Sequence, residues 1–174
     1  MATDFVLWQA IADPFASRFD DHEGNIAFTI READRSSNVV LRISREQAWA
    51  EGHQNIMGPS NAFLYFGPNN SMGHIVYGSG PVNHMATALR QHREGSTSRY
   101  FTAQNAKHYK WRYSPTRMEC MDGRAPVAVW EINPDPNVHY YASLTVKPWA
   151  IAIITEIVTS LTLNRMAASL RWDY

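Results

Sequence analysis

The stretch Arg99-Tyr-Phe-Thr-Ala-Gln-Asn-Ala-Lys-His-Tyr-Lys-Trp-Arg-Tyr113 predicts two short aromatic strands joined by a tight turn. In its second strand, three aromatic residues alternate with three basic or imidazole residues: Tyr109, Trp111 and Tyr113 with His108, Lys110 and Arg112. Successive side chains of a strand point to opposite faces of a sheet. We therefore expect the aromatic set to face the core and the basic set to form a stripe on the surface.

Outward from this stretch, short strand candidates recur along most of the chain. We expect strands over residues 26–31, 39–43, 62–66, 74–77, 100–103, 108–113, 117–121, 126–132 and 139–146. Gly, Pro and Asn clusters separate them, which is the pattern of tight turns. Many short strands at such spacing are typical of a sandwich or barrel.

Two segments depart from the strand pattern. Residues 82–93 have apolar positions on one side and predict a short amphipathic helix. Residues 148–170 are apolar nearly all round, which predicts a helix buried on most of its surface. Three polar residues, Glu156, Asn164 and Arg165, interrupt this second helix. We therefore expect a core helix and no transmembrane segment.

Together these elements predict a mostly β (α+β) protein with an antiparallel sheet or β-barrel around the C-terminal helix. The inward strand faces and the helix then cover each other. Because Trp111 is large and carries one N–H donor, we expect it to lie buried against this helix near Ile154 or Val158, with its ring nitrogen paired. At 174 residues the chain predicts a single domain, 1–174.

The composition excludes some classes of function. Sixteen basic and sixteen acidic side chains cancel, which argues against general nucleic-acid binding. The single cysteine, Cys120, permits no internal disulfide and favours a reducing compartment. The N-terminus has no basic region before its apolar residues, so we expect no signal peptide and a cytoplasmic location. Cys120 lies in a predicted strand, which favours a buried inert thiol over a nucleophile.

Several segments together resemble a known family. They are Tyr100-Phe-Thr-Ala with Tyr109-Lys-Trp-Arg112, the turn Asp21-His-Glu-Gly24, Pro126-Val-Ala-Val-Trp130 and Ile154-Thr-Glu-Ile-Val-Thr159. The chain resembles the fungal domain-of-unknown-function 6593 family over about residues 14–165. One position departs from the family pattern, because Asn105-Ala106 replaces the common Asp-Gly turn. Alanine tolerates positive φ less well than glycine, so we expect a different turn type.

The resemblance implies a fold and a direction for function. It implies a single tubby-like or scramblase-like β-barrel wrapped around the C-terminal helix. It implies no established reaction, because the family is named for lacking one. By analogy with related tubby-like domains, it points to binding of phosphoinositides or a membrane surface.

The basic stripe is the first candidate site. His108, Lys110 and Arg112, with Arg99 and Lys107, form a predicted ligand-binding set for a phosphate or lipid headgroup. The alternative interpretation is a solvated strand face without a ligand. The leading hypothesis is thus a non-enzymatic intracellular binding domain for an anionic lipid headgroup or a protein partner, peripheral to a membrane in the first case.

The loops between Gly67 and His92 are the second candidate, and they define an alternative function. They hold glycines, amides and three residues suited to acid–base chemistry, His74, Tyr77 and His84. Under this alternative the chain is a small-molecule enzyme with these residues at its catalytic site. A flexible surface connection is the competing interpretation of the same loops.

We expect neither a metal nor a cofactor. The sequence has no His-x-His, His-Glu-x-x-His or Cys-x-x-Cys motif. The group Asp20, Asp21 and Glu23 resembles part of a calcium loop but lacks the twelve-residue spacing, which favours an acidic turn.

Overall fold

The computed structural model describes residues 2–35 and 37–172. Its elements in chain order are β1 (Phe5–Gln9), β2 (Ser17–Asp20), β3 (Ile26–Arg35), β4 (Val39–Arg45), α1 (Gln47–Glu51), β5 (Asn61–Tyr65), η1 (Pro68–Asn70), β6 (His74–Tyr77), β7 (Val82–His84), α2 (Met85–Ala88), β8 (Ser98–Thr102), β9 (His108–Tyr113), β10 (Arg117–Asp122), β11 (Ala125–Ile132), β12 (Ala142–Val146), η2 (Pro148–Ile153) and α3 (Ile154–Ser169). The strands form one antiparallel sheet of order β7-β6-β5-β4-β3-β2-β1-β12-β11-β10-β9-β8.

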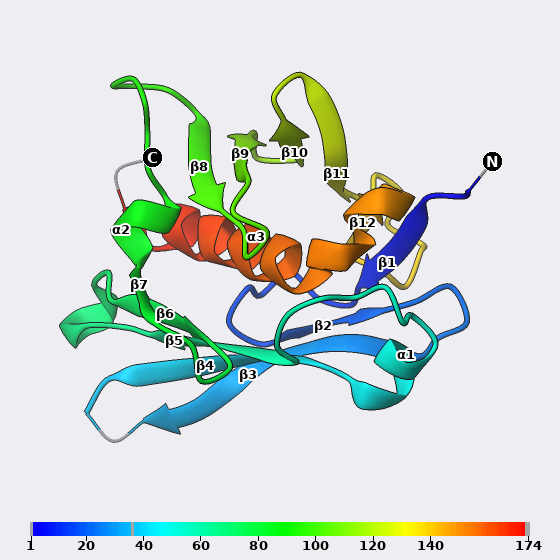
Figure 1. Ribbon diagram of the computed structural model, residues 1–174, viewed down its shortest axis with the longest axis horizontal. Helices are drawn as coiled ribbons and strands as arrows, with labels where there is room; N and C mark the ends of the chain where they lie inside the picture. Colours follow the sequence, from blue (N-terminus) through cyan, green and yellow to red (C-terminus); the bar gives the residue numbers. More distant parts are fainter. Residues whose placement is uncertain (1, 36, 173–174) are drawn as a thin grey trace.

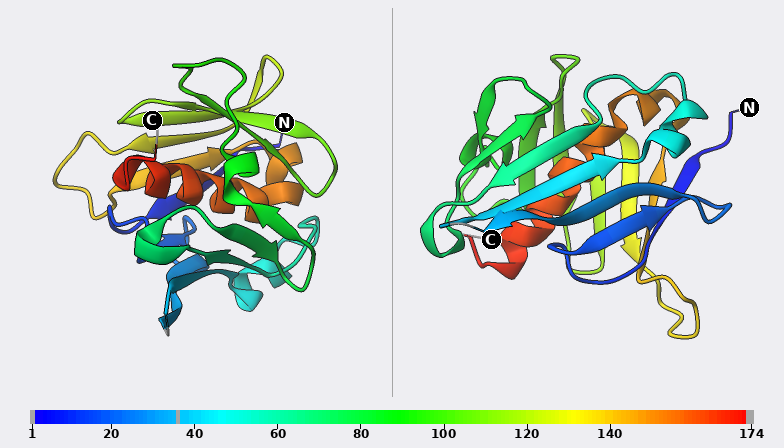
Figure 2. Two further views of the ribbon diagram at one scale, coloured as in Figure 1. Left: turned by 90° about the vertical axis from the view of Figure 1, so that its left-hand side faces the viewer. Right: turned by 90° about the horizontal axis from the view of Figure 1, so that it is seen from below.

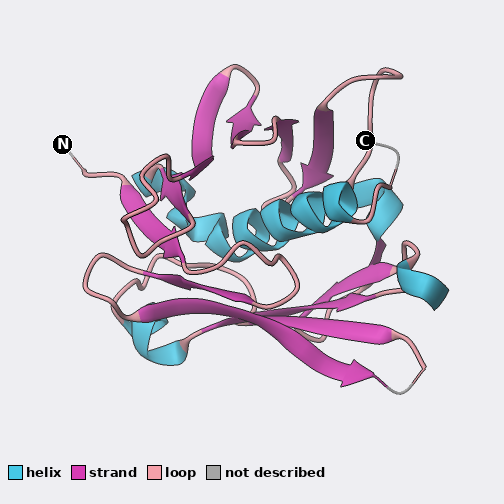
Figure 3. Cartoon of the chain, turned by 180° about the vertical axis from the view of Figure 1, so that it is seen from behind, coloured by secondary structure: helices cyan, strands magenta, loops and turns pink. Residues whose placement is uncertain are grey.

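This sheet curls around α3. Figure 1 shows β2 to β7 below the helix and β8 to β11 above it, with β1 and β12 linking the two halves. The view from behind in Figure 3 shows the helix running between the same two layers. Each half of the sheet thereby covers one side of the helix, and the helix fills the space between the inward strand faces.

The sheet is open along one line, which we call the seam. Its edge strands β7 and β8 form no ladder with each other in the described part of the chain, and α2 lies between them (Figure 2). One backbone bridge, from the Tyr100 N–H to the Arg90 carbonyl at 2.9 Å, ties the segment after α2 to β8. The structure thus has the curled sheet that was expected, but its described strands do not close into a barrel.

Helix α3 is buried on almost every side. Ile157, Val158 and Leu161 are inaccessible to solvent. The span Pro148–Ser169 is long and apolar enough to cross a membrane, with a mean hydropathy of 1.3, yet 89% of that window is buried inside the fold. That burial supports the expectation of a core helix.

Two of the polar residues that interrupt α3, Asn164 and Arg165, have partners. Arg165 lies over the ring of Trp130 at 4.6 Å and donates a hydrogen bond to the Ala12 carbonyl. Asn164 donates to the Ser160 carbonyl at 2.8 Å. A buried polar group that keeps its hydrogen bond costs far less than an unpaired one, so this helix tolerates polar residues within an apolar core.

The aromatic alternation in β9 is confirmed. Trp111 is 0% exposed, and its ring N–H donates a 2.8 Å hydrogen bond to the Ser160 hydroxyl on α3. Tyr109 is buried and Tyr113 is partly buried, whereas His108 and Arg112 are exposed. This strand therefore attaches the upper half of the sheet to the core helix.

The predicted strands over 74–77 and 108–113 have the observed bounds, and the other seven overlap observed strands. Strands β1, β2 and β7 were not predicted. The helix expected over 82–93 is wrong in extent, because Val82–His84 pair with β6 and only Met85–Ala88 are helical. Pairing with a neighbouring strand outweighs local helical periodicity at this sheet edge.

The turn between β8 and β9 has an alanine in the left-handed region. Ala106 has φ +63°, a conformation that favours glycine. The Asn105 side chain supports the turn by accepting from the Lys107 N–H at 3.0 Å and donating to the Tyr109 hydroxyl at 3.0 Å. Asparagine and alanine thus form this turn without a glycine.

Candidate functional site

A basic cleft lies on the outer face of β8 and β9, with a volume of about 700 Å³. It is lined by Arg90, His92, Tyr100, His108, Tyr109, Lys110, Met121 and Gly123. Tyr100 lies opposite Lys110 in the ladder, and Thr102 lies opposite His108. Directly paired residues share a face of the sheet, so β8 and β9 present these side chains together.

The charge of this cleft is uncompensated. Arg90 and Lys110 form no ion pair with any described side chain, and no carboxylate lines the cleft. The neighbouring cations differ, because Lys107 pairs with Asp122 at 3.3 Å and Arg112 pairs with Glu119 at 3.5 Å. Positive potential therefore concentrates at the cleft rather than along the whole stripe.

Ring contacts and a hydrogen bond hold the cleft in shape. The imidazole of His92 stacks parallel on the ring of Tyr100 with 3.6 Å between centroids. On the adjacent strand, Nδ1 of His108 lies 2.8 Å from the Thr102 hydroxyl, which leaves Nε2 free to contact a ligand. Fixed donors around a concave surface are the arrangement that binds an anion through charge-assisted hydrogen bonds.

The structure places the five residues predicted to bind a ligand in three different surroundings: in the cleft, beside it, and buried. His108 and Lys110 line the cleft, whereas Lys107 and Arg112 lie beside it in ion pairs. Arg99 is only 3% exposed, and its guanidinium donates to the Ser96 carbonyl at 2.6 Å. It is separated from the stripe because it lies opposite Trp111 in the ladder and shares the inward face.

Sequence reasoning missed three cleft residues: Arg90, His92 and Tyr100. The period-two pattern of β8 identifies Tyr100, since Arg99 and Phe101 are both buried. No local signal identifies Arg90 and His92, because contacts with the distant Tyr100, a backbone bridge and a ring stack, bring that segment alongside β8.

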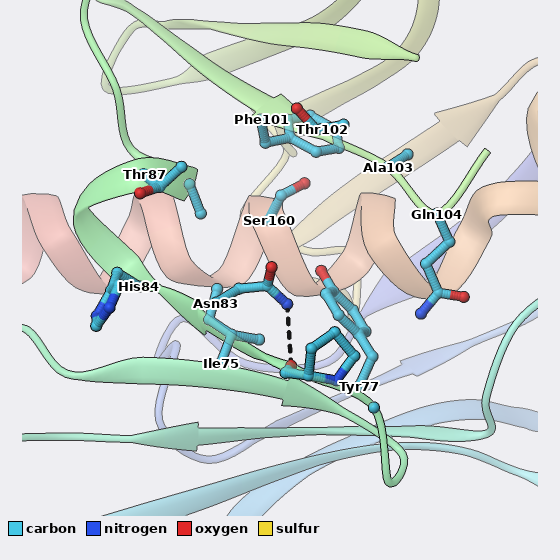
Figure 4. Close-up of a pocket in the computed structure, with 13 residues that line it drawn as sticks. Ile75, Tyr77, Asn83, His84, Thr87, Phe101, Thr102, Ala103, Gln104 and Ser160 are labelled. Atoms are coloured by element: carbon cyan, nitrogen blue, oxygen red, sulfur yellow. Dashed lines mark hydrogen bonds between the residues drawn. The ribbon is translucent and has the colours of Figure 1, made fainter. Parts of the chain in front are cut away.

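A second concave region, the seam pocket, occupies about 270 Å³ between the two sheet edges (Figure 4). Its apolar walls include Ile75 and Pro81 on one side and Phe101 on the other. Its polar groups include Tyr77 and Gln104. The seam is therefore a lined depression over α3 and not only a gap in the ladder.

Of the three residues of the enzyme alternative, Tyr77 and His84 line the seam pocket, whereas His74 does not. His74 lies on the outer face of β6, where it stacks on Tyr65 with 4.7 Å between centroids, while Tyr77 lines the seam pocket on the inner side. His84 pairs with His74 in the ladder, and in Figure 4 its ring is turned away from Tyr77. Burial and the nearby Glu156 carboxyl raise the pKa of Tyr77, so its phenol stays protonated at neutral pH.

The remaining candidates are the Cys120 thiol, the acidic group around Asp21 and possible metal ligands. Burial, with a smaller effect of Asp122, raises the pKa of the Cys120 thiol, and this agrees with an inert cysteine. Asp21 Oδ1 accepts the N–H groups of Glu23 and Asn25 at 2.9 and 2.8 Å, which confirms the acidic turn. Burial works against ionisation of Asp21, but the hydrogen bonds from Asn25 and Glu23 outweigh it and lower the pKa. No group of three His, Cys, Asp or Glu side chains within the described residues is placed to hold a metal ion.

Comparisons with known proteins identify one family. The model of DUF6593, described as a family of unknown function, matches residues 12–166. No curated protein and no solved structure matches the chain significantly.

Proposed function

The chain belongs to the DUF6593 family, and we propose that it is a non-enzymatic binding domain that holds a phosphate-bearing lipid headgroup in the basic cleft. The observation that carries the proposal is the convergence of Arg90 and Lys110, both without a described carboxylate partner, on one concave surface. Cations that have no internal partner are available to an external anion without first breaking an ion pair.

The remaining cleft groups suit the same ligand. The imidazoles of His92 and His108 add N–H donors, and the stacked Tyr100 provides a flat wall. Intracellular membrane surfaces carry phosphate headgroups at negative potential, and nearby Lys and Arg side chains are attracted to them. The proposal therefore includes a cytoplasmic protein that associates peripherally with a membrane. The curled sheet around a terminal helix also supports, as part of this proposal, the tubby-like relation that the sequence resemblance implies.

The test is vesicle flotation with matched charge reversals on β9. Vesicles of phosphatidylcholine alone are compared with vesicles that also contain phosphatidylinositol bisphosphate. We expect binding only to the second kind, weakening as salt is raised. Lys110→Glu should reduce it at least tenfold, whereas Arg112→Glu makes the same charge change outside the cleft and should reduce it much less.

Inositol hexakisphosphate in solution separates the two sources of phosphate. If it binds the cleft while no vesicle floats the protein, the ligand is a soluble anion and the membrane part of the proposal is wrong. If Lys110→Glu and Arg112→Glu weaken binding equally, the attraction is a general surface effect and the cleft is not the site.

A further inference from the structure

The seam pocket lies at a different part of the molecule from the basic cleft, and its chemistry is different. We propose that it binds a small uncharged molecule with an apolar body and one polar end, such as a hydroxyl, carbonyl or amide group. Figure 4 shows its walls converging from two sides over α3: Ile75 and Tyr77 from β6, and Phe101 from β8. This second site is independent of the headgroup site.

The size and walls of the pocket define the apolar body. A volume of about 270 Å³ is equivalent to about nine water molecules at roughly 30 Å³ each. Between Ile75, Pro81 and Phe101 such water has few protein hydrogen-bond partners. An apolar group of that size releases the water and covers the walls, which is the usual driving force for ligand entry into such pockets.

The polar end of the ligand is defined by groups beside Tyr77 and Gln104. The Gln104 N–H donates to Glu156 Oε1 at 3.2 Å, so the Glu156 carboxyl lies directly behind the pocket lining. Glu156 is 2% exposed, and its second oxygen, Oε2, has no hydrogen-bond partner among the described residues. The fully buried hydroxyl of Thr159, one helical turn further on, interacts with the Tyr77 phenol.

An unpaired buried polar atom of this kind is costly, because its hydration is lost without a replacement hydrogen bond. The Ser160 hydroxyl does not pair with the Glu156 oxygen, because it accepts from the Trp111 ring and donates its proton to the Ile157 carbonyl. A ligand hydroxyl or amide that enters past Tyr77 supplies both a donor and an acceptor. The unpaired Glu156 oxygen, close to the Tyr77 phenol, therefore indicates a polar end that forms hydrogen bonds.

The surroundings of the pocket disfavour a charged ligand. No described Lys, Arg, Asp or Glu lines it, and its one histidine, His84, is exposed to solvent. The nearby Arg45 donates to the Thr155 hydroxyl and to the carbonyls of Gly58 and Pro59. Burial raises the pKa of Glu156, which favours the neutral carboxyl and removes a counter-charge for a cation. An anionic or a cationic ligand would thus lose its hydration in this pocket without forming a compensating ion pair.

Nuclear magnetic resonance titrations of the full chain can test the class of ligand with three probes that share one ring. We expect benzyl alcohol to shift the amide signals of Gly80, Ala88 and Gln104 saturably. Sodium benzoate and benzylammonium chloride should bind at least tenfold more weakly. Equal binding of benzoate or benzylammonium would contradict an uncharged ligand, and the absence of saturable shifts with all three probes would contradict the site itself.

Two alanines of α2 provide matched variants. Ala88 lines the pocket, whereas the exposed Ala86 does not. Ala88→Phe fills the space and should weaken benzyl alcohol binding at least tenfold, while Ala86→Phe should leave it unchanged. If circular dichroism shows that Ala88→Phe is unfolded, Thr87→Trp at the exposed rim replaces it. Unchanged affinity in a folded blocking variant overturns the proposal.

Discussion

The two halves of the curled sheet are joined in very different ways on their two sides. On one side β1 and β12 pair over five register positions, from Phe5 with Val146 to Gln9 with Ala142. On the other side, at the seam, one backbone bridge between Arg90 and Tyr100 and the stacking of His92 on Tyr100 link the segment after α2 to β8. The continuous side holds the fold together, whereas the interrupted side leaves room for a pocket. Binding sites are often placed where a rigid scaffold stops pairing with itself.

The largest effect should come from removing the anchor between the upper half and the core helix. Trp111→Ala deletes a fully buried ring and its hydrogen bond to Ser160 and should lower the free energy of unfolding by about 3–5 kcal/mol. Trp149→Ala is the control, since Trp149 is 54% exposed and should change stability by less than about 0.5 kcal/mol. Urea denaturation measures both. Similar losses in the two variants would show that Trp111 is not an anchor.

A second pair of variants compares the paired side of the sheet, at β12, with the seam, at β7. Leu144 is fully buried on β12, and Leu144→Ala should cost about 2–5 kcal/mol in unfolding free energy. Val82 lies on the edge strand β7 and is 58% exposed, so Val82→Ala should cost less than about 0.5 kcal/mol. If Val82→Ala lowers the free energy of unfolding as much as Leu144→Ala does, the edge strand at the seam contributes more to stability than its exposure indicates.

The pH dependence of stability should report on the carboxyl behind the seam. Burial raises the pKa of Glu156 in the folded state above its ordinary value of 4.5. The unfolded chain therefore releases this proton first, and the contribution of Glu156 to stability is complete below about pH 4.5 and is lost as the pH rises through the folded pKa. Glu156→Gln removes this loss without changing the side-chain shape.

Urea denaturation of the natural chain and of Glu156→Gln at a series of pH values between 4 and 8 checks the sign. The stability of the natural chain, relative to the variant, should fall as the pH rises. A difference that grows with pH instead would mean that the folded state favours the charged carboxylate, as in an ion pair with Arg45.

The smallest effect concerns the turn that borders the seam. Ala106 has φ +63°, which costs an L-residue about 1–2 kcal/mol, whereas glycine adopts it freely but loses more entropy on folding. Ala106→Gly should therefore raise the free energy of unfolding by up to about 1 kcal/mol. The reverse change, Gly123→Ala at φ +58° with no neighbouring atom within 4 Å, should lower it by a similar amount. Thermal unfolding of both variants tests the pair.

Local periodicity was sufficient for the elements that are defined by their own sequence. The alternation in β9 predicted that Trp111 lies on the buried face of the strand. The all-round apolar character of residues 148–170 predicted the core helix. Both depend on side chains within one element. The same reasoning applied to β8 would have placed Arg99 inside, but its charge suggested the surface.

The parts that were missed depend on contacts between distant segments. Strand β1 pairs with β12 across almost the whole chain, and its own sequence gives little indication of that partner. The cleft residues Arg90 and His92 reach β8 only because α2 ends early and the chain crosses the seam. Long-range pairing of this kind is set by the whole fold, which a local pattern does not encode.

The position of α3 after the twelve described strands has a consequence for biosynthesis. A ribosome releases the strands first, and they emerge without the helix that covers their inward faces. Until residues 154–169 leave the exit tunnel, the nascent sheet has unpaired edges and uncovered apolar surface, which are the features that promote aggregation. Completion of the core thus waits until α3 has been translated, and a chaperone has its greatest opportunity to act just before then.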